Sequence, residues 1–289
     1  MREAGSVSKV LIILLVLATL LSAASCGREA IGGTLLDLTR EIPEGTTSFV
    51  YWDAKQIEGD DDLSQLRDKW KADNEAWLDV FGIGTDAVNH FLYFSLDENV
   101  TGQFLGFSRY GNNVLDVRGD FERDRLRTAL KTRNHSKGDW KDIEVWQTLD
   151  KQEWLALARD SLIGGDKDAV RQCIDVIEGD LPSLYDSQDA KDVTGRLPNG
   201  ILVCFFNYAN VTPGPPYEGL LANGASLQKK DQDTLRLKLV CKFAEPEDAA
   251  NAVESIRDDV DMDFGAVKAE QDGRFVILTG EISIDSLFT

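Results

Sequence analysis

One short pattern, which occurs twice, constrains the fold more than any other feature of this sequence. An apolar residue, a proline and a glycine occur together at Ile42-Pro43-Glu44-Gly45 and again at Leu197-Pro198-Asn199-Gly200. Each motif leads into a run of aromatic and β-branched residues that is typical of a strand. Further strands and a helix follow in the same order in both halves, which predicts two related structural units.

Hydrophobic periodicity predicts the elements of these units. Between residues 113 and 121, Leu115 and Val117 alternate with Asp116 and Arg118, so this strand should bury one face and expose the other. Residues 235–243 alternate in the same way. A helix should follow each strand, at 122–133 and at 246–260, and a strand pair should follow each helix, at 143–159 and at 266–279. Further helices are predicted at 63–81 and 167–178.

These elements predict an α+β fold made of two related units, each an antiparallel sheet with helices packed on one face. The expected boundaries are a signal peptide over residues 1–25, a tether over 26–40, a first unit over 41–182 and a second over 183–289. A helix over 183–193 should join the units. The alternative is that the two sheets form one continuous sheet.

The first 26 residues indicate export. Arg2 and Lys9 precede an apolar run from Val10 to Leu21, which fits the hydrophobic region of a secretory signal. The run is shorter than the roughly 20 apolar residues that a membrane-spanning helix needs. It therefore predicts a cleaved signal, with an uncleaved anchor as the alternative.

The residues that end this run, Ser22-Ala23-Ala24-Ser25-Cys26, resemble the lipobox of bacterial lipoproteins. Ala23 departs from the leucine most common there. The resemblance implies that Cys26 carries a diacylglycerol and becomes the mature N-terminus, so that the protein is lipid-anchored to the cell membrane on its extracytoplasmic side. Two or three acyl chains suffice for stable anchoring, whereas one chain is marginal.

The charge of the chain restricts its partners. Lysine and arginine number 31 against 50 aspartates and glutamates, a formal net charge of −19. Such a chain should repel nucleic acid and anionic headgroups, so contact with the membrane is expected through the lipid on Cys26. The repeated units also resemble a bacterial family of exported proteins of unknown function. That resemblance implies fold and location but no catalytic residue and no cofactor.

One acidic segment raises the hypothesis of a calcium site. Asp259, Asp261, Asp263 and Glu270 stand at positions 1, 3, 5 and 12 of a loop, as in an EF-hand. The glycine falls at position 7, however, where an EF-hand needs it at position 6. We therefore favour an acidic helix end that turns into a strand, and keep calcium as the alternative.

Two other residue sets are candidates for binding or bonding. Trp140 and Trp146 would form a stacking platform for a glycan or an envelope protein if exposed; the favoured alternative is that they cover a second helix layer. Cys173, Cys204 and Cys241 are expected to be buried free thiols. A Cys204–Cys241 disulfide is the alternative if their strands are neighbours.

The sequence leaves two function classes open. We favour a non-enzymatic binding, scaffold or envelope-associated module, because no nucleophile motif stands out and the two histidines, His90 and His135, have no catalytic or metal-binding spacing. The alternative is an exported hydrolase that uses aspartate or glutamate as acid and base. A pocket with a buried carboxyl of raised pKa would favour the hydrolase, and an exposed apolar patch the binding module.

Overall fold

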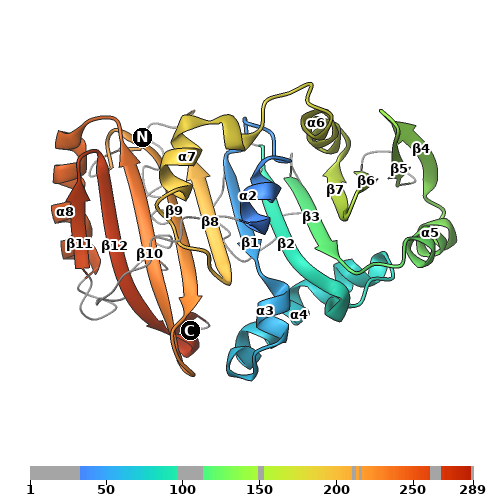
Figure 1. The fold of residues 1–289 in the computed structure, drawn as a ribbon, viewed down its shortest axis with the longest axis horizontal. Coiled ribbons are helices and arrows are strands. Elements are labelled where there is room, and N and C mark those ends of the chain that lie inside the picture. Colours follow the sequence, from blue (N-terminus) through green and yellow to red (C-terminus); the bar gives the residue numbers. More distant parts are fainter. Residues whose placement is uncertain are drawn as a thin grey trace, which may run out of the picture.

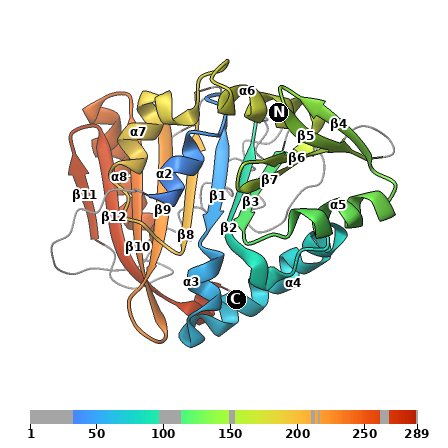
Figure 2. The ribbon, with the colours of Figure 1, turned by 45° about the vertical axis from the view of Figure 1, so that its right-hand side comes forward.

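All strands of the described chain belong to one antiparallel sheet. The structure is a computed structural model that describes residues 33–96, 113–148, 153–209, 213–214, 217–260 and 268–287. The strand order is β11-β12-β10-β9-β8-β1-β2-β3-β7-β6-β5-β4 (Figure 1). The sheet curves strongly towards its β4 end (Figure 2).

The two predicted units meet in the middle of this sheet. The first contributes β1 (Ser48–Trp52), β2 (Val88–Ser95), β3 (Asn113–Gly119), β4 (Ser136–Trp140), β5 (Ile143–Gln147), β6 (Glu153–Ala158) and β7 (Ser161–Asp166). The second contributes β8 (Leu202–Asn207), β9 (Leu220–Lys229), β10 (Thr234–Phe243), β11 (Lys268–Asp272) and β12 (Phe275–Ser283). Because β1 pairs with β8, the continuous-sheet alternative is correct. From this seam outward the strands run in matching order, β1-β2-β3-β7-β6 and β8-β9-β10-β12-β11, and β4–β5 is an additional hairpin.

Helices cover both faces of the sheet. The helices are α2 (Thr34–Thr39), α3 (Ala54–Glu58), α4 (Ser64–Val80), α5 (Arg123–Thr132), α6 (Lys167–Ile177), α7 (Gln188–Thr194) and α8 (Pro246–Val260). Side chains of α3, α4, α5 and α8 belong to one core cluster, and those of α2, α6 and α7 to the other. No helix in the described part of the chain is long and apolar enough to cross a membrane.

The α+β class and the antiparallel sheet are therefore confirmed, but the expectation of helices on one face is wrong. The physical reason is that the central strands are apolar on both faces. In β1, Phe49 belongs to the core under α2, whereas Trp52 belongs to the core under α4. Buried on both sides, the sheet needs two helix layers.

The second half of the predicted tether is part of the folded body. Residues 34–39 form α2, in which Leu35 and Leu38 are buried against the sheet. The counterpart of α2 is α7, which stands before Pro198 as α2 stands before Pro43. The predicted joining helix over 183–193 is a short 3₁₀ turn, Leu184–Asp186, followed by α7.

The body cysteines are all free and buried, so the alternative of a Cys204–Cys241 disulfide is wrong. Cys204 of β8 lies opposite Ala225, and Cys241 of β10 lies opposite Asn223; both partners belong to β9. Two strand spacings alone separate the cysteines by at least about 9.6 Å, beyond the ~7 Å limit for Cα atoms of a disulfide. The free-thiol expectation is confirmed.

Candidate functional site

Several predicted site residues fall outside the described chain. Cys26, Asp261 and Asp263 are among them. Asp259 lies in the last turn of α8, and Glu270 lies in β11. The hairpin β11–β12 stands where an EF-hand would begin its second helix. Within the described ranges no three His, Cys, Asp or Glu side chains gather as metal ligands. The calcium site stays a hypothesis.

The predicted tryptophan platform is not formed. Trp146 is 1% exposed and packs in the core, where its Nε1 donates to Oε1 of Glu144 at 2.8 Å. The ring of Trp140 is covered by the guanidinium of Arg171 from α6, which lies 4.5 Å from the ring centroid. For Trp140, the favoured alternative of a contact with a helix layer is correct.

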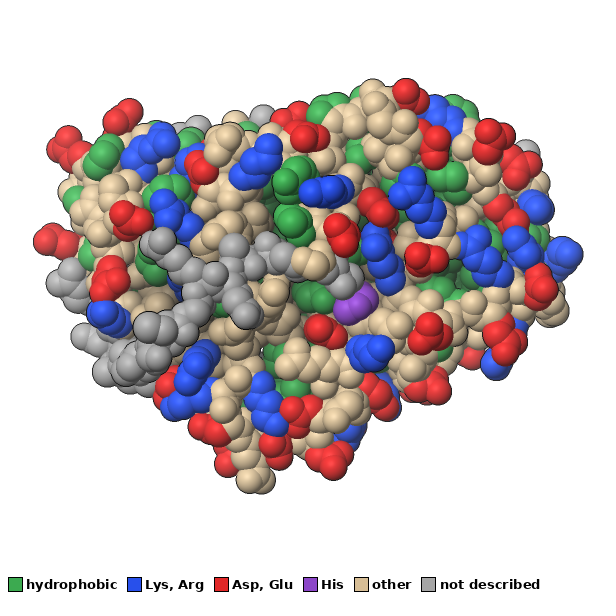
Figure 3. Space-filling model, viewed as in Figure 1, with side chains coloured by type: hydrophobic (Ala, Val, Ile, Leu, Met, Phe, Trp, Pro, Cys, Tyr) green, Lys and Arg blue, Asp and Glu red, His purple; other side chains and the backbone are tan. Residues whose placement is uncertain are grey.

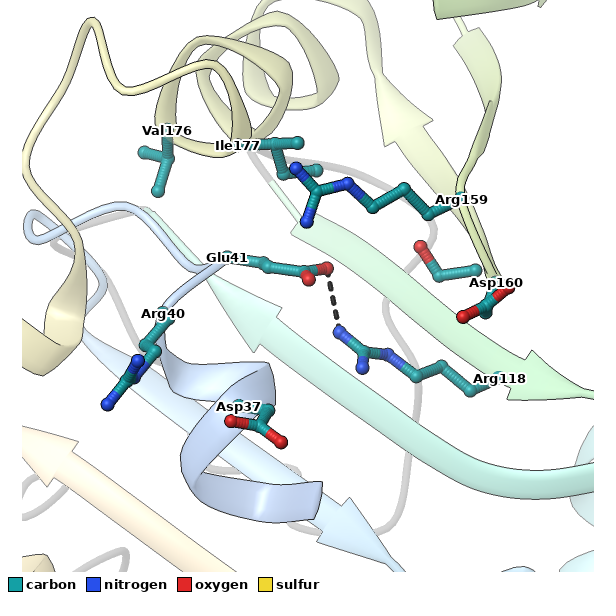
Figure 4. A pocket seen from close by; sticks show the side chains of 9 residues that line it. Asp37, Arg40, Glu41, Arg118, Arg159, Asp160, Val176 and Ile177 are labelled. Atoms are coloured by element: carbon teal, nitrogen blue, oxygen red, sulfur yellow. Dashed lines mark ion pairs between the residues drawn. The ribbon is translucent and has the colours of Figure 1, made fainter. Parts of the chain in front are cut away.

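A charged cleft lies where α2, the end of α6, strand β3 and the β6–β7 turn come together (Figure 4). On this face of the molecule basic and acidic side chains are interspersed (Figure 3). The cleft has a volume of about 410 Å³. Its lining combines three guanidinium groups, three carboxylates, one hydroxyl and two apolar side chains: Arg40, Arg118, Arg159, Asp37, Glu41, Asp160, Ser161, Val176 and Ile177.

An ion pair forms the floor of the cleft. Nη2 of Arg118 lies 2.7 Å from Oε2 of Glu41, and these side chains are 19% and 20% exposed. Arg159 extends over this pair from the opposite wall, whereas Arg40 points away from it (Figure 4). The guanidinium of Arg40 lies 4.5 Å from the ring centroid of Tyr185. Arg118 and Arg159 are therefore the cations that face the interior of the cleft.

Asp116 is buried beside the floor, which contradicts the prediction that its strand face is wet. It is 3% exposed, and its Oδ1 has no hydrogen-bond partner among the described residues. Burial raises the pKa of Asp116 to about 7; the charge of Arg118 and the nearby Ser161 hydroxyl oppose this effect, and the charge of Glu41 adds to it. Asp116 does not line the cleft.

A second hollow lies beyond the Arg159–Asp160 turn, with a volume of about 290 Å³. His90 lines it, and its Nδ1 lies 2.9 Å from the hydroxyl of Tyr51. Burial is the main cause that lowers the pKa of His90, which favours the neutral imidazole. His90 is thus a hydrogen-bonded packing residue that lies beside Arg118 across β2 and β3.

The hydroxyl that lines both hollows is not placed as a nucleophile. Ser161 stands opposite Arg118 in the β3–β7 pair, so β3 separates it from His90 in β2. The Oγ of Ser161 donates to the backbone oxygen of Ala158 at 3.3 Å. A serine nucleophile needs a base within hydrogen-bond reach. The arrangement is suited to binding charged groups rather than to acyl transfer.

Backbone strain marks one residue of the cleft that sequence patterns did not single out. Arg159 and Asp160 form the two-residue connection between β6 and β7, and Arg159 has φ 34°. Two-residue hairpin turns that need positive φ at their first position usually hold glycine or asparagine there. An arginine in a tight turn, flanked by two strands, is the signal that was available in the sequence.

Comparisons with known proteins give no function. No protein-family model matches the chain. An uncharacterised protein of Methanocaldococcus jannaschii, MJ0635, is 24% identical over 287 residues, which cover 96% of each chain. Solved structures of TP0453 in crystal forms IV and I have TM-scores of 0.49 and 0.45 with 12% and 10% identity, and cover 85% of this chain and 94% of theirs. The M. jannaschii relative is archaeal, so it does not support the bacterial origin implied by the lipobox-like motif. The chain is thus similar to an uncharacterised protein along nearly its whole length.

Proposed function

We propose that this chain is a lipid-anchored, extracytoplasmic protein that binds a small polar solute without transforming it. The observation that supports this most directly is the cleft of about 410 Å³, into which guanidinium and carboxylate groups project. Its volume lies in the range of roughly 300 to 1,000 Å³ that is typical of small-molecule sites. Polar groups with opposite charges fix the orientation of a ligand in such sites.

Anchoring is proposed from the lipobox-like motif that ends at Cys26. Since α2 begins at Thr34, only residues 27–33 separate Cys26 from the folded body. Seven residues span at most about 25 Å, which would keep the cleft close to the membrane surface. With a net charge of −19, the protein is not expected to bind nucleic acid.

The anchoring proposal is tested with Cys26→Ser. Cells that express either chain are fed an alkyne analogue of palmitate, and membranes are separated from soluble fractions. The wild-type chain should be labelled and sediment with membranes, whereas the variant should carry no label. Normal labelling of the variant would refute lipidation at Cys26.

Binding without turnover is tested by incubating the purified protein with a mixture of small polar solutes. The bound fraction is recovered by ultrafiltration and identified by mass spectrometry. We expect enrichment of a solute with unchanged mass. Recovery of a hydrolysed product instead would support an enzyme.

An exported hydrolase is the second candidate, because Asp116 is a buried carboxyl with a raised pKa close to a cleft. Asp116 does not line the cleft, so for this role its side chain would have to move to reach a substrate. Asp116→Asn should then abolish turnover of any substrate found. Hydrolysis that persists in the variant would exclude Asp116 as the acid or base.

A further inference from the structure

We propose that the cleft recognises a zwitterionic solute with an apolar side chain, an α-amino acid or short peptide, whose carboxylate binds Arg159 and whose ammonium group binds Asp37. This inference rests on the proposed solute-binding function and names the class of ligand. Its basis is the placement of opposite charges on the walls of one cavity, together with two independent observations on Arg159 and Asp37.

The walls of the cleft present charges of both signs. The turn wall carries Arg159 and Asp160, and the α2 wall carries Asp37; Arg40 points away to Tyr185, and the floor ion pair is already neutral. A simple anion would meet the carboxylates of Asp37 and Asp160, and a simple cation would meet the guanidinium of Arg159. At a separation of 4 Å each such contact between charges is worth roughly 1 to 4 kcal/mol. A ligand with both charges gains from both kinds of group.

The apolar part of the ligand has its own surface. Val176 and Ile177, at the end of α6, form the ceiling of the cleft opposite the charged floor (Figure 4). Val176 is 6% exposed and so belongs to the fixed framework of the fold. A hydrocarbon side chain that is directed towards α6 would bury apolar area at roughly 25 cal/mol per Å².

Arg159 is held in a costly backbone conformation without a structural use for its side chain. A non-glycine residue at such positive φ costs of order 1 to 3 kcal/mol, and strain of this kind concentrates at functional sites. Among the described residues its guanidinium makes no hydrogen bond and no ion pair. The side chain is therefore available to a ligand.

The second unit provides an internal comparison for Asp37. Asp37 and Asp192 each stand six positions before the proline of their unit, Pro43 and Pro198. Asp192 is neutralised: its Oδ2 lies 2.6 Å from Nζ of Lys242, a side chain that is 3% exposed. Asp37 has no ion pair among the described residues. The same position is thus closed by a lysine in the second unit and open to a cleft in the first.

The ligand class is tested by calorimetric titration of the purified full-length protein with four matched probes. L-Leucine and Leu-Leu carry both charges, N-acetyl-L-leucine lacks the ammonium group, and L-leucinamide lacks the carboxylate. We expect leucine or Leu-Leu to bind at least about tenfold more tightly than either blocked probe, a difference of about 1.4 kcal/mol. Equal binding of a blocked probe, or no binding of leucine and Leu-Leu up to about 10 mM, would overturn the proposal.

Two variants separate a binding role from a structural one. Arg159→Gly removes the guanidinium and relieves the strained φ, so affinity should fall at least about tenfold while the melting temperature stays equal or rises. Asp142→Gly is the matched control, since Asp142 has φ 64° in the remote β4–β5 turn and should leave affinity unchanged. A loss of stability in Arg159→Gly with unchanged affinity would refute the role of Arg159.

Failure of this inference is distinguishable from failure of the proposed function. If leucine probes do not bind but the ultrafiltration experiment still recovers an unchanged solute, the ligand class is wrong and the binding function stands. If neither experiment finds a ligand, both are wrong.

Discussion

Replacing Asp116 with asparagine should stabilise the protein at neutral and alkaline pH but not in acid. In the folded chain burial raises the pKa of Asp116 from 3.8 to about 7. Below pH 3.8 the carboxyl is protonated in both the folded and the unfolded chain, so it imposes no electrostatic cost. Between these values only the unfolded chain ionises readily, so stability falls as the pH rises. Above about pH 7 the carboxyl is ionised in both the folded and the unfolded chain, and the folded chain keeps the full free-energy cost of the buried charge.

The size of this cost follows from the two pKa values. At 1.36 kcal/mol per pH unit, the difference between 3.8 and about 7 corresponds to about 4 kcal/mol. Asparagine has the shape of the protonated carboxyl and does not ionise. The groups around it, Arg118, Glu41, Ser161 and Cys173, stay in place in the variant. The free energy of unfolding of Asp116→Asn should therefore match the wild type near pH 4 and exceed it by up to about 4 kcal/mol at pH 8.

Urea unfolding of both proteins at pH 4, 6 and 8 measures this difference. Comparison at the same pH cancels the contributions of all other titrating groups. Asp142→Asn, at an exposed turn, is the matched control for the loss of one negative charge. A difference between Asp116→Asn and wild type that is the same at pH 4 and pH 8 would refute the reasoning, because Asp116 would then not change its protonation cost on folding.

Three further outcomes are expected. Lys242→Met leaves the carboxylates of Asp189 and Asp192 without their buried cation, so urea unfolding should show a loss of about 3 kcal/mol in the free energy of unfolding. Lys268→Met, which removes an exposed ion pair, should change this free energy by less than about 0.5 kcal/mol; equal losses in the two variants would contradict a stabilising role of the buried pair. Unreduced Cys26→Ser protein should show no reactive thiol when folded and three when denatured, those of Cys173, Cys204 and Cys241. A count of one in the denatured protein would indicate a disulfide. Calcium titrated calorimetrically into chelator-stripped protein should give no binding heat, because a strand stands where an EF-hand needs a helix; saturable heat would revive the calcium hypothesis.

Periodic, local patterns were read correctly from the sequence. The helix predicted over 246–260 is α8, with the same limits, and the alternating run at 235–243 lies within β10. These elements carry their own signals: a proline suited to the first helical turn, and apolar residues at every second position. The repeat of the proline motif correctly predicted that both halves begin alike.

Strands in which packing against segments distant in sequence requires small residues were not predicted. Residues 164–166, Gly-Gly-Asp, have the composition of a turn but end β7, where Gly165 lies so close to β3 that a Cβ would stand 2.3 Å from the backbone oxygen of Asn113. In β9, a Cβ on Gly224 would stand 3.0 Å from side chains of Val193 and Leu197. Small residues are required there by packing partners distant in sequence, and no local pattern shows this.

The cleft was missed for a related reason. Alternation in β3 correctly places Asp116 and Arg118 on one face, but only α6, which covers that face, makes it a buried one. Asp37 lies in the segment that was predicted to be a tether, and Glu41 directly follows that segment. A site assembled from a helix, a turn and a strand of separate regions has no continuous motif to recognise.

The β1–β8 seam has the form of an isologous dimer interface within one chain. Taken alone, each unit would end in an unpaired apolar strand, with Phe49 on one side and Phe205 on the other, whose rings stack at 5.5 Å. Such an edge is a template for pairing with another copy. Antiparallel pairing of two like edges places the units about a local two-fold axis, as in a symmetric homodimer. The outer edge strands β4 and β11, by contrast, are five residues long and carry lysine and acidic residues. These edges therefore disfavour pairing with a further strand, and the sheet ends after two units.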